Sequence, residues 1–260
     1  MRSLVALTVA MLLCASCAKG TPTNPILPEG VSPTPLPQPA YVGIGRYSKL
    51  AETTAPQTFG GIPFINFVEV QQSADSTITH RDEAGFVYAL KGRHTVSWND
   101  GERQKSWDEG TADWVNPDAA HLNLSSADTT WYLVAFRSIG LRGASLPYSN
   151  YRTLYTTSDL TPPLPGKNLV HQLGLITMDP GGRTSAHSHG GVEAFYVMKG
   201  TVELALNNGT RTKITVGQGA SVRPGLIMQL HVVGDEPVQI LTYFVTAEGQ
   251  PWQTNLQTLP

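Results

Sequence analysis

Three side chains that could bind a metal ion stand close together in GGRTSAHSHGGVEAFYVMKG, residues 181–200. His187 and His189 are one residue apart, and Glu193 follows four positions later. In a β-strand, residues two apart point to the same side, so the two imidazoles project together. Glu193 has the same parity, and the two glycines before it allow the chain to bend. The spacing predicts that all three side chains face one interior.

Two neutral imidazoles and one carboxylate form a facial set of ligands that suits Fe(II), and also Mn(II) or Zn(II). Such a set leaves coordination positions open for a substrate or for dioxygen. The alternative is that these residues line a pocket without a metal. Buried polar groups need partners, however, and an inward-facing set of this kind is hard to satisfy without metal or water. We therefore predict one mononuclear metal site.

The first 20 residues, MRSLVALTVAMLLCASCAKG, have the layout of a secretory signal peptide. An apolar stretch from Leu4 to Leu13 is followed by small residues around Cys17. The ASC sequence also resembles a bacterial lipobox, in which the cysteine is lipidated and becomes the first mature residue. Ordinary cleavage near Ala18 is the alternative. We expect an extracytoplasmic lipoprotein of the bacterial cell envelope, or otherwise a secreted or periplasmic protein.

Composition removes several classes of function. Both cysteines of the chain, Cys14 and Cys17, lie in the signal-like segment. The folded part therefore has no disulfide, thiolate ligand or cysteine nucleophile. The formal net charge is -2, and the 18 Lys and Arg residues are scattered. This distribution predicts no nucleic-acid partner. No apolar run is long enough to be an internal membrane span, so we expect a membrane contact only through the lipid anchor.

Short β-like runs such as INFVEV, WYLVAF and VQILTYFV, broken by Gly, Pro, Asn and Asp, make up the chain after residue 40. Amphipathic helical periodicity is nearly absent, so the pattern predicts an all-β sandwich or barrel. The sequence from Gly85 is repeated from Glu193, with Gly92 and Gly101 falling on Gly200 and Gly209. The two copies are about 108 residues apart, which is near the usual size of a small domain.

These patterns divide the chain into six segments. We predict a signal peptide over 1–17, a proline-rich stalk over 18–40, a first barrel over 41–140, a connector over 141–167, a second barrel over 168–250 and a C-terminal tail over 251–260.

The positions Gly181, His187, His189, Glu193 and Gly200 resemble the first motif of the cupin superfamily. This resemblance implies a bicupin, that is, two tandem cupin barrels of the double-stranded β-helix or jelly-roll type. Members of the family bind Fe, Mn, Ni, Cu, Zn or no metal. They include dioxygenases, decarboxylases, isomerases, sugar-binding domains and storage proteins, so the resemblance implies the fold more than the function.

The second cupin motif is only partly present, and it places Met228 where the family usually has a fourth ligand. A thioether is a poor donor for Fe(II), Mn(II) or Zn(II), although it suits Cu(I). The alternative is that Met228 packs in an apolar barrel wall. Gln229 has the opposite parity, and His231 lies nearby in the sequence. His171, before the motif, is a further residue that could enter the pocket or be exposed.

The first repeat has Thr79, Arg81 and Gly85 at the three ligand positions, and these cannot rebuild the metal site. His121 occupies its second-motif histidine position. One interpretation is that this barrel only packs and forms hydrogen bonds. The other is a small anion pocket of Arg81 and His121, because an inward guanidinium offers a rigid fork to carboxylate or phosphate. A slip of one residue would place His80 inside instead.

Three functions stay open at this point. The first is a metal-dependent enzyme, dioxygenase- or decarboxylase-like, that acts on a small organic molecule beside the metal of the second barrel. The second is a non-catalytic extracytoplasmic protein that binds a small ligand, and the third is a structural module. The intact first motif favours the enzyme, whereas incomplete ligation in both barrels favours the other two.

Overall fold

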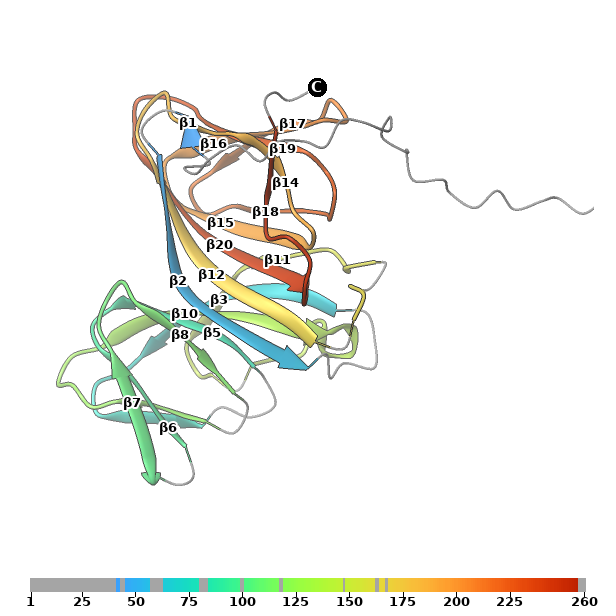
Figure 1. Ribbon diagram of the computed structural model, residues 1–260. Coiled ribbons are helices and arrows are strands. Elements are labelled where there is room, and N and C mark those ends of the chain that lie inside the picture. The colour runs from blue at the N-terminus through green and yellow to red at the C-terminus, as the bar shows by residue number, and fades with distance from the viewer. Residues whose placement is uncertain are drawn as a thin grey trace, which may run out of the picture. The chain divides into compact units, whose positions relative to one another are not determined.

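The structure of the chain is a computed structural model (Figure 1). It describes residues 41–42, 45–56, 63–79, 84–98, 101–116, 119–146, 148–161, 164–166 and 168–256. The signal-like segment, Cys17, the proline-rich stalk, His80 and Arg81 lie outside these residues. Among the described residues, no helix has the length and apolarity needed to span a membrane.

The described part of the chain is all-β, as the sequence predicts, apart from short 3-10 turns such as η2 (Ile139–Leu141). Its strands alternate buried and exposed side chains or, where both faces are covered, are buried throughout. They form four antiparallel sheets, two for each half of the repeat.

The second barrel is built from a five-stranded and a seven-stranded sheet. The five-stranded sheet has the order β18 (Gly219–Val222), β15 (Val192–Lys199), β20 (Val238–Ala247), β12 (Asn168–Met178) and β2 (Gly45–Pro56). The seven-stranded sheet contains β1 (Tyr41–Val42), β13 (Arg183–Thr184), β19 (Met228–Val232), β14 (Ala186–Ser188) and β21 (Thr254–Leu256), with β16 (Thr201–Leu206) and β17 (Arg211–Thr215) extending it from β19.

The first barrel repeats this plan. Its five-stranded sheet has the order β11 (Tyr151–Thr156), β3 (Pro63–Gln72), β10 (Thr129–Ser138), β5 (Gly85–Lys91) and β8 (Ala112–Val115). Its four-stranded sheet has the order β4 (Ser76–Thr79), β9 (Ala120–Asn123), β6 (His94–Trp98) and β7 (Arg103–Trp107). The internal repeat in the sequence therefore corresponds to the two five-stranded sheets, whose strands follow a matching order.

Three strands join sheets that their position in the sequence does not predict. Strand β2 falls in the range expected for the first barrel, yet it pairs along its length with β12 of the second barrel (Figure 1). Strand β11 falls in the expected connector and pairs with β3 of the first barrel. Strand β21 falls in the expected tail and pairs with β14. The second barrel thus receives strands from both ends of the described chain.

Apolar side chains form three clusters. One cluster fills the space between the two five-stranded sheets, with Phe67, Phe86 and Phe136 from the first and Leu173 and Tyr243 from the second. The other two clusters fill the interiors of the first and the second barrel. Each five-stranded sheet is therefore covered on both faces.

Candidate metal centre

The structure brings His187, His189 and Glu193 together inside the second barrel. One possible ligand atom from each residue lies within 4.8 Å of those of the other two, and all three residues are buried. His187 lies on β14, His189 follows that strand directly, and Glu193 is the second residue of β15. The common parity that the sequence predicts for these residues agrees with this arrangement.

Backbone carbonyls fix the orientation of both imidazoles. Nδ1 of His187 lies 2.8 Å from the carbonyl oxygen of Ser185, and Nδ1 of His189 lies 2.5 Å from that of Trp252. A carbonyl only accepts, so each Nδ1 carries the proton and each Nε2 keeps its lone pair. Metal-binding histidines have this arrangement, in which the outer nitrogen donates to a carbonyl or carboxylate.

Glu193 is a buried carboxylate that is only partly satisfied by the protein. Oε1 accepts a hydrogen bond of 2.7 Å from the hydroxyl of Thr242. Oε2 lies 3.2 Å from Nε2 of His189, but neither atom has a hydrogen-bond partner among the described residues. A buried carboxylate oxygen without a donor is costly, and a cation between these two atoms would satisfy both.

The ionisation states also suit a metal. Burial, together with the neighbouring His189, lowers the pKa of the His187 imidazole from 6.5 to about 4. Burial works to raise the pKa of Glu193, but the contacts with His189 and His187 and the hydrogen bond from Thr242 outweigh it. The pKa of Glu193 therefore lies below its ordinary value. At neutral pH the site offers a neutral His187 and an ionised carboxylate.

The distances fit a single ion after a small adjustment. A metal with bonds of about 2.1 Å keeps any two of its ligand atoms within about 4.2 Å of each other. Nε2 of His189 and Oε2 of Glu193 are already within that limit. In a tetrahedral or facial set two ligand atoms lie about 3.4 Å apart or less, so the widest pair, which is within 4.8 Å, closes by up to about 1.4 Å through side-chain torsions. The donor set therefore fits a divalent transition metal.

Two close backbone contacts hold the loop between the ligands. A Cβ at Gly191 would lie 2.0 Å from the carbonyl oxygen of Val245, so only glycine fits there. The amide of Gly225, three residues before Met228, donates a hydrogen bond of 3.0 Å to the carbonyl oxygen of His189. These contacts fix where β15 begins and hence where Glu193 points.

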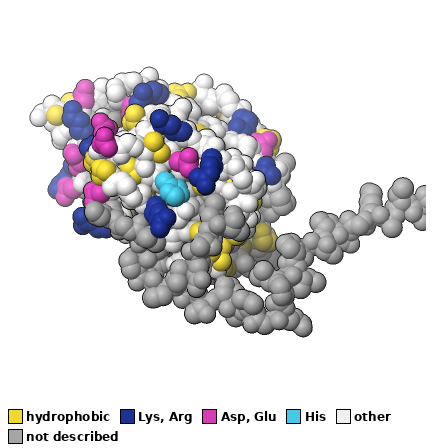
Figure 2. Space-filling view, turned by 90° about the horizontal axis from the view of Figure 1, so that it is seen from above, with side chains coloured by type: hydrophobic (Ala, Val, Ile, Leu, Met, Phe, Trp, Pro, Cys, Tyr) yellow, Lys and Arg dark blue, Asp and Glu magenta, His cyan; other side chains and the backbone are white. Residues whose placement is uncertain are grey.

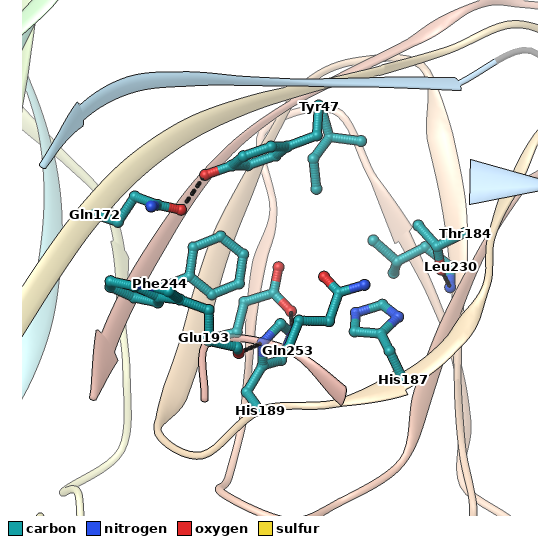
Figure 3. A pocket seen from close by; sticks show the side chains of 11 residues that line it. Tyr47, Gln172, Thr184, His187, His189, Glu193, Leu230, Phe244 and Gln253 are labelled. Carbon is teal, nitrogen blue, oxygen red and sulfur yellow. Dashed lines mark hydrogen bonds and ion pairs between the residues drawn. The ribbon is translucent and has the colours of Figure 1, made fainter. Parts of the chain in front are cut away.

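A cavity of about 170 Å³ opens beside the three residues (Figure 3). Figure 3 shows Tyr47 and Gln172 on one side of it and the two histidines with Glu193 on the other. The cavity is lined by Tyr47, Gln172, Ile176, Thr184, His187, His189, Glu193, Leu230, Phe244, Trp252 and Gln253. Part of its wall is aromatic, since the Phe244 ring lies 4.8 Å from that of His189 and 6.2 Å from that of Trp252, centre to centre.

Several lining residues were not expected from the sequence. Tyr47 comes from β2, and Trp252 and Gln253 come from the segment before β21. These segments reach the site by pairing with β12 and β14 across more than 60 residues of sequence. Gln172 could have been expected near a site, because it is a polar residue that lies among the mostly buried residues of β12.

Met228 is fully buried and pairs with His187 across β14 and β19. Its side chain belongs to the apolar cluster of the barrel interior and is not among the lining residues. Gln229 donates a hydrogen bond of 2.8 Å to the carbonyl oxygen of Thr184. His231 is partly exposed and lies opposite Arg183 and Glu203. The structure thus places none of these three side chains on the cavity.

His171 faces away from the cavity and into the apolar cluster between the two sheets. Its Nδ1 lies 2.6 Å from the hydroxyl of Tyr243. Its ring lies 5.0 Å from that of Trp114 and 5.4 Å from that of Phe136, centre to centre. Burial lowers the pKa of His171 from 6.5 to about 4. This histidine is neither a pocket residue nor an exposed one.

In the first barrel, Thr79 ends β4 and Gly85 begins β5. His121 is buried on β9, where its Nδ1 lies 2.9 Å from Nε2 of His94 and its ring stacks on Trp131 at 4.4 Å. Burial lowers the pKa of His94 from 6.5 to about 3. His121 therefore packs within the core of this barrel. The other half of the expected anion pocket, Arg81, is outside the described residues.

Charged side chains are mixed on the face seen in Figure 2, where basic and acidic groups alternate over short distances. Two of the exposed ion pairs are Arg211 with Glu203 and Lys49 with Glu52. Among the described residues of that face, the charges form no patch of a single sign.

Comparisons with known proteins agree with this architecture. A sequence profile described as "Cupin domain" matches residues 174–244. The structure is similar to that of an oxalate decarboxylase from Lactobacillus farciminis in complex with formate, with a TM-score of 0.53 and 12% identity over 83% of this chain and 85% of that chain. A vicilin from tomato (Solanum lycopersicum) gives a TM-score of 0.52 and 11% identity over 74% of this chain and 77% of that chain.

A mutant of the Bacillus subtilis oxalate decarboxylase gives a TM-score of 0.52 and 13% identity over 83% of this chain and 76% of that chain. The comparison with curated proteins finds no match. These results support the cupin superfamily, and at such low identity the structural likeness concerns the fold and not the activity. The chain folds into two tandem cupin barrels, as the sequence predicts.

Proposed function

We propose that this protein is a metal-dependent enzyme whose second barrel holds one divalent transition metal and acts on a small organic molecule. The observation that carries the proposal is the convergence of one possible ligand atom each from His187, His189 and Glu193 at the wall of a cavity. Fe, Mn, Ni, Cu and Zn are the candidate metals. When bound, such an ion supplies Lewis-acid polarisation of a coordinated oxygen and, for the redox-active metals, electron transfer.

The residues of the chain divide the remaining work. The carbonyls of Ser185 and Trp252 fix the orientation of the two imidazoles and leave both Nε2 lone pairs available to a metal. The hydroxyl of Thr242 orients the Glu193 carboxylate. His187, His189 and Glu193 would hold the metal with three protein ligands, and such a set would leave coordination positions open for a substrate or for dioxygen.

The cavity indicates what kind of molecule would bind. Its volume of about 170 Å³ is close to that of an engineered protein cavity of about 150 Å³ that binds benzene. Among the described residues that line it, there is neither Lys nor Arg. A substrate carboxylate that did not bind the metal would have no basic side chain beside it among these described residues, and an unpaired buried charge is costly. A neutral molecule of about one ring fits best, which favours oxidation over decarboxylation of a free acid.

A non-catalytic ligand-binding protein is the second candidate, and one observation favours it. Apart from the three possible metal ligands, Tyr47 is the titratable side chain among the described lining residues. Burial and the nearby Glu193 and Glu52 raise the pKa of the Tyr47 phenol far above its ordinary value. Tyr47 is therefore a weak acid, and any proton transfer has to involve the metal or the substrate.

Metal analysis and turnover together test the proposal. The full chain, purified without chelators, is expected to contain up to one transition metal per chain, and His187→Ala to lose it. His231→Ala is the matched control, because it removes an imidazole of the same barrel that does not line the cavity. Metal-dependent consumption of neutral one-ring compounds supports the enzyme, whereas metal-dependent binding without consumption supports the second candidate. A metal content that His187→Ala does not change contradicts both.

We also propose that the protein is exported and anchored by a lipid on Cys17. The apolar stretch, the small residues and the cysteine of the first 20 residues support this. Radiolabelled palmitate is expected in the wild-type protein made in a bacterial host and in Cys14→Ser, but not in Cys17→Ser. An unlabelled mature protein that begins after Cys17 would contradict lipidation, and a protein that keeps residues 1–17 would contradict export.

A further inference from the structure

A chain of hydrogen bonds runs from the cavity to the protein surface through β2 and β12. The hydroxyl of Tyr47 is bonded to Oε1 of Gln172. Nε2 of Gln172 donates to Oε2 of Glu52 at 2.7 Å, and Nζ of Lys49 lies 3.3 Å from the same oxygen. Tyr47 and Gln172 line the cavity, whereas Glu52 and Lys49 are exposed.

The carboxylate at the surface fixes the direction of every bond in this chain. An ionised carboxylate only accepts hydrogen bonds, so Gln172 must turn its NH₂ group toward Glu52. Its carbonyl oxygen Oε1 then faces Tyr47, and a carbonyl oxygen also only accepts. The phenol of Tyr47 must therefore donate its single proton to Gln172. What Tyr47 has left to offer the cavity is the lone pairs of its oxygen.

The position of the Tyr47 ring depends on a glycine in the neighbouring strand. A Cβ at Gly174 would lie 2.3 Å from Cε2 of Tyr47, so the ring lies directly over the bare backbone of β12. The register between β2 and β12 shifts at the same place, between Leu173 and Gly174. The ring also meets that of Phe244 edge-on, at 6.2 Å between centres. Tyr47 is thus held in one place by Gly174, Gln172 and Phe244.

Gln253, like Tyr47, presents a hydrogen-bond acceptor to the cavity, but at another point of its wall. Its Nε2 is bonded to Oδ1 of Asn255, which also accepts the hydroxyl of Ser185 at 3.1 Å. The carbonyl oxygen of Gln253 accepts neither of these hydrogen bonds and can accept one from a ligand, and Figure 3 shows this side chain near the three possible metal ligands. Two lining residues from separate segments, Tyr47 of β2 and Gln253 before β21, therefore present acceptors.

We propose that Tyr47 is a specificity-determining residue that accepts a hydrogen bond from the substrate, and that the substrate is a neutral, one-ring molecule with a hydroxyl or N–H group. The inference rests on the proposed function, since it concerns the cavity beside the metal. Molecules that carry only acceptors at this position bind more weakly, because they would face the Tyr47 lone pairs without a proton to share. The expected discrimination is that of one neutral hydrogen bond, about fivefold in Kd.

Phenol and fluorobenzene are suitable probes because they have nearly the same shape, and only phenol has a proton to donate. The measured quantity is the ratio of the Kd of fluorobenzene to the Kd of phenol, determined by ligand-observed NMR on the full chain. Tyr47→Phe is expected to lower this ratio about fivefold relative to the wild type. Comparing the ratios cancels the difference in hydrophobicity between the two probes.

Two further variants test the chain of bonds itself. Glu52→Gln replaces an obligatory acceptor by an amide that can also donate, so Gln172 is free to turn and the ratio is expected to fall. Glu203→Gln is the matched control on β16, where the carboxylate pairs with Arg211, and is expected to leave the ratio unchanged. Gly174→Ala displaces the Tyr47 ring and is expected to act like Tyr47→Phe.

The inference is overturned if Tyr47→Phe keeps the wild-type ratio, if Glu203→Gln lowers it as much as Glu52→Gln does, or if neither probe binds the wild type. Metal content is measured on the same samples. A chain without a metal site but with a preference that depends on Tyr47 would overturn only the proposed function. A chain with the metal and without that preference would overturn only this inference.

Discussion

The buried His171 makes the stability of the protein depend on pH in a way that one substitution can isolate. Burial between the two five-stranded sheets lowers its pKa from 6.5 to about 4. As the pH falls below 6.5, the unfolded chain takes up a proton that the folded chain refuses, so the free energy of unfolding decreases. This loss continues until the pH reaches the folded-state pKa, about 4.

The decrease in the free energy of unfolding follows from the width of the pH range between the unfolded-state and folded-state pKa values of His171. One pKa unit corresponds to about 1.4 kcal/mol, so by pH 5 the single imidazole of His171 has cost about 2 kcal/mol relative to pH 7.5. His94, whose pKa is lowered to about 3, adds a similar loss over the same interval. His171→Gln keeps a group that can bond the Tyr243 hydroxyl but does not titrate. It is expected to remove about 2 kcal/mol of the pH dependence.

Urea unfolding at pH 7.5 and pH 5.0, followed by circular dichroism, measures this. From pH 7.5 to pH 5.0 the urea midpoint is expected to fall further in the wild type than in His171→Gln, by on the order of 1 M. His231→Gln, at a partly exposed position, is the control and is expected to resemble the wild type more closely. Equal losses in the wild type and His171→Gln would refute the argument that His171 is buried and neutral in the folded protein.

The remaining predictions concern the metal centre. Met228→Leu is expected to leave the metal content unchanged and to lower the free energy of unfolding by under about 1.5 kcal/mol, because the side chain only packs. Mass spectrometry measures the metal content. If Met228→Leu lost the metal as completely as His187→Ala, the thioether would be a ligand and copper would be the leading metal. Thr242→Val is expected to weaken metal affinity about 10- to 100-fold in a competition titration. Thr246→Val is the control, because the buried hydroxyl of Thr246 has no partner among the described residues. Equal metal affinities in the two variants would contradict the role of the Thr242 hydroxyl in orienting Glu193.

The three possible metal ligands could be predicted from the sequence because they are close in the chain. His187 and His189 share a face through the two-residue period of a strand, and glycines return the chain so that Glu193 meets them. The all-β class and the tandem repeat were predictable for a similar reason. Short runs of β-favouring residues and recurring glycines are local signals.

The outer part of the cavity could not be predicted because it is assembled by pairing over long distances. Tyr47 belongs to β2, which comes before the strands of the first barrel in the sequence but pairs with β12. Glu52 and Gln172, which are partners in this pairing, are 120 positions apart in the sequence. Trp252 and Gln253 precede a three-residue strand that pairs beside His187. Alternation within a strand predicts which faces are buried, but it does not say which strand lies alongside.

His171 illustrates the same limit in a single residue. The sequence suggests a choice between a pocket residue and an exposed one, and the structure gives a third place, the apolar layer between two sheets. That layer exists because the first and second barrels cover each other's five-stranded sheets. No local pattern near His171 carries this information.

The central claim is that His187, His189 and Glu193 together hold one metal ion. Anomalous diffraction from crystals of the metal-loaded protein tests it most directly, with data collected on both sides of the absorption edge of the metal found in solution. The account predicts one peak per chain at about 2.0–2.2 Å from Nε2 of both histidines and from a Glu193 oxygen. A metal-loaded crystal with its peak in the first barrel or at Met228, and none within bonding distance of these three atoms, would contradict it.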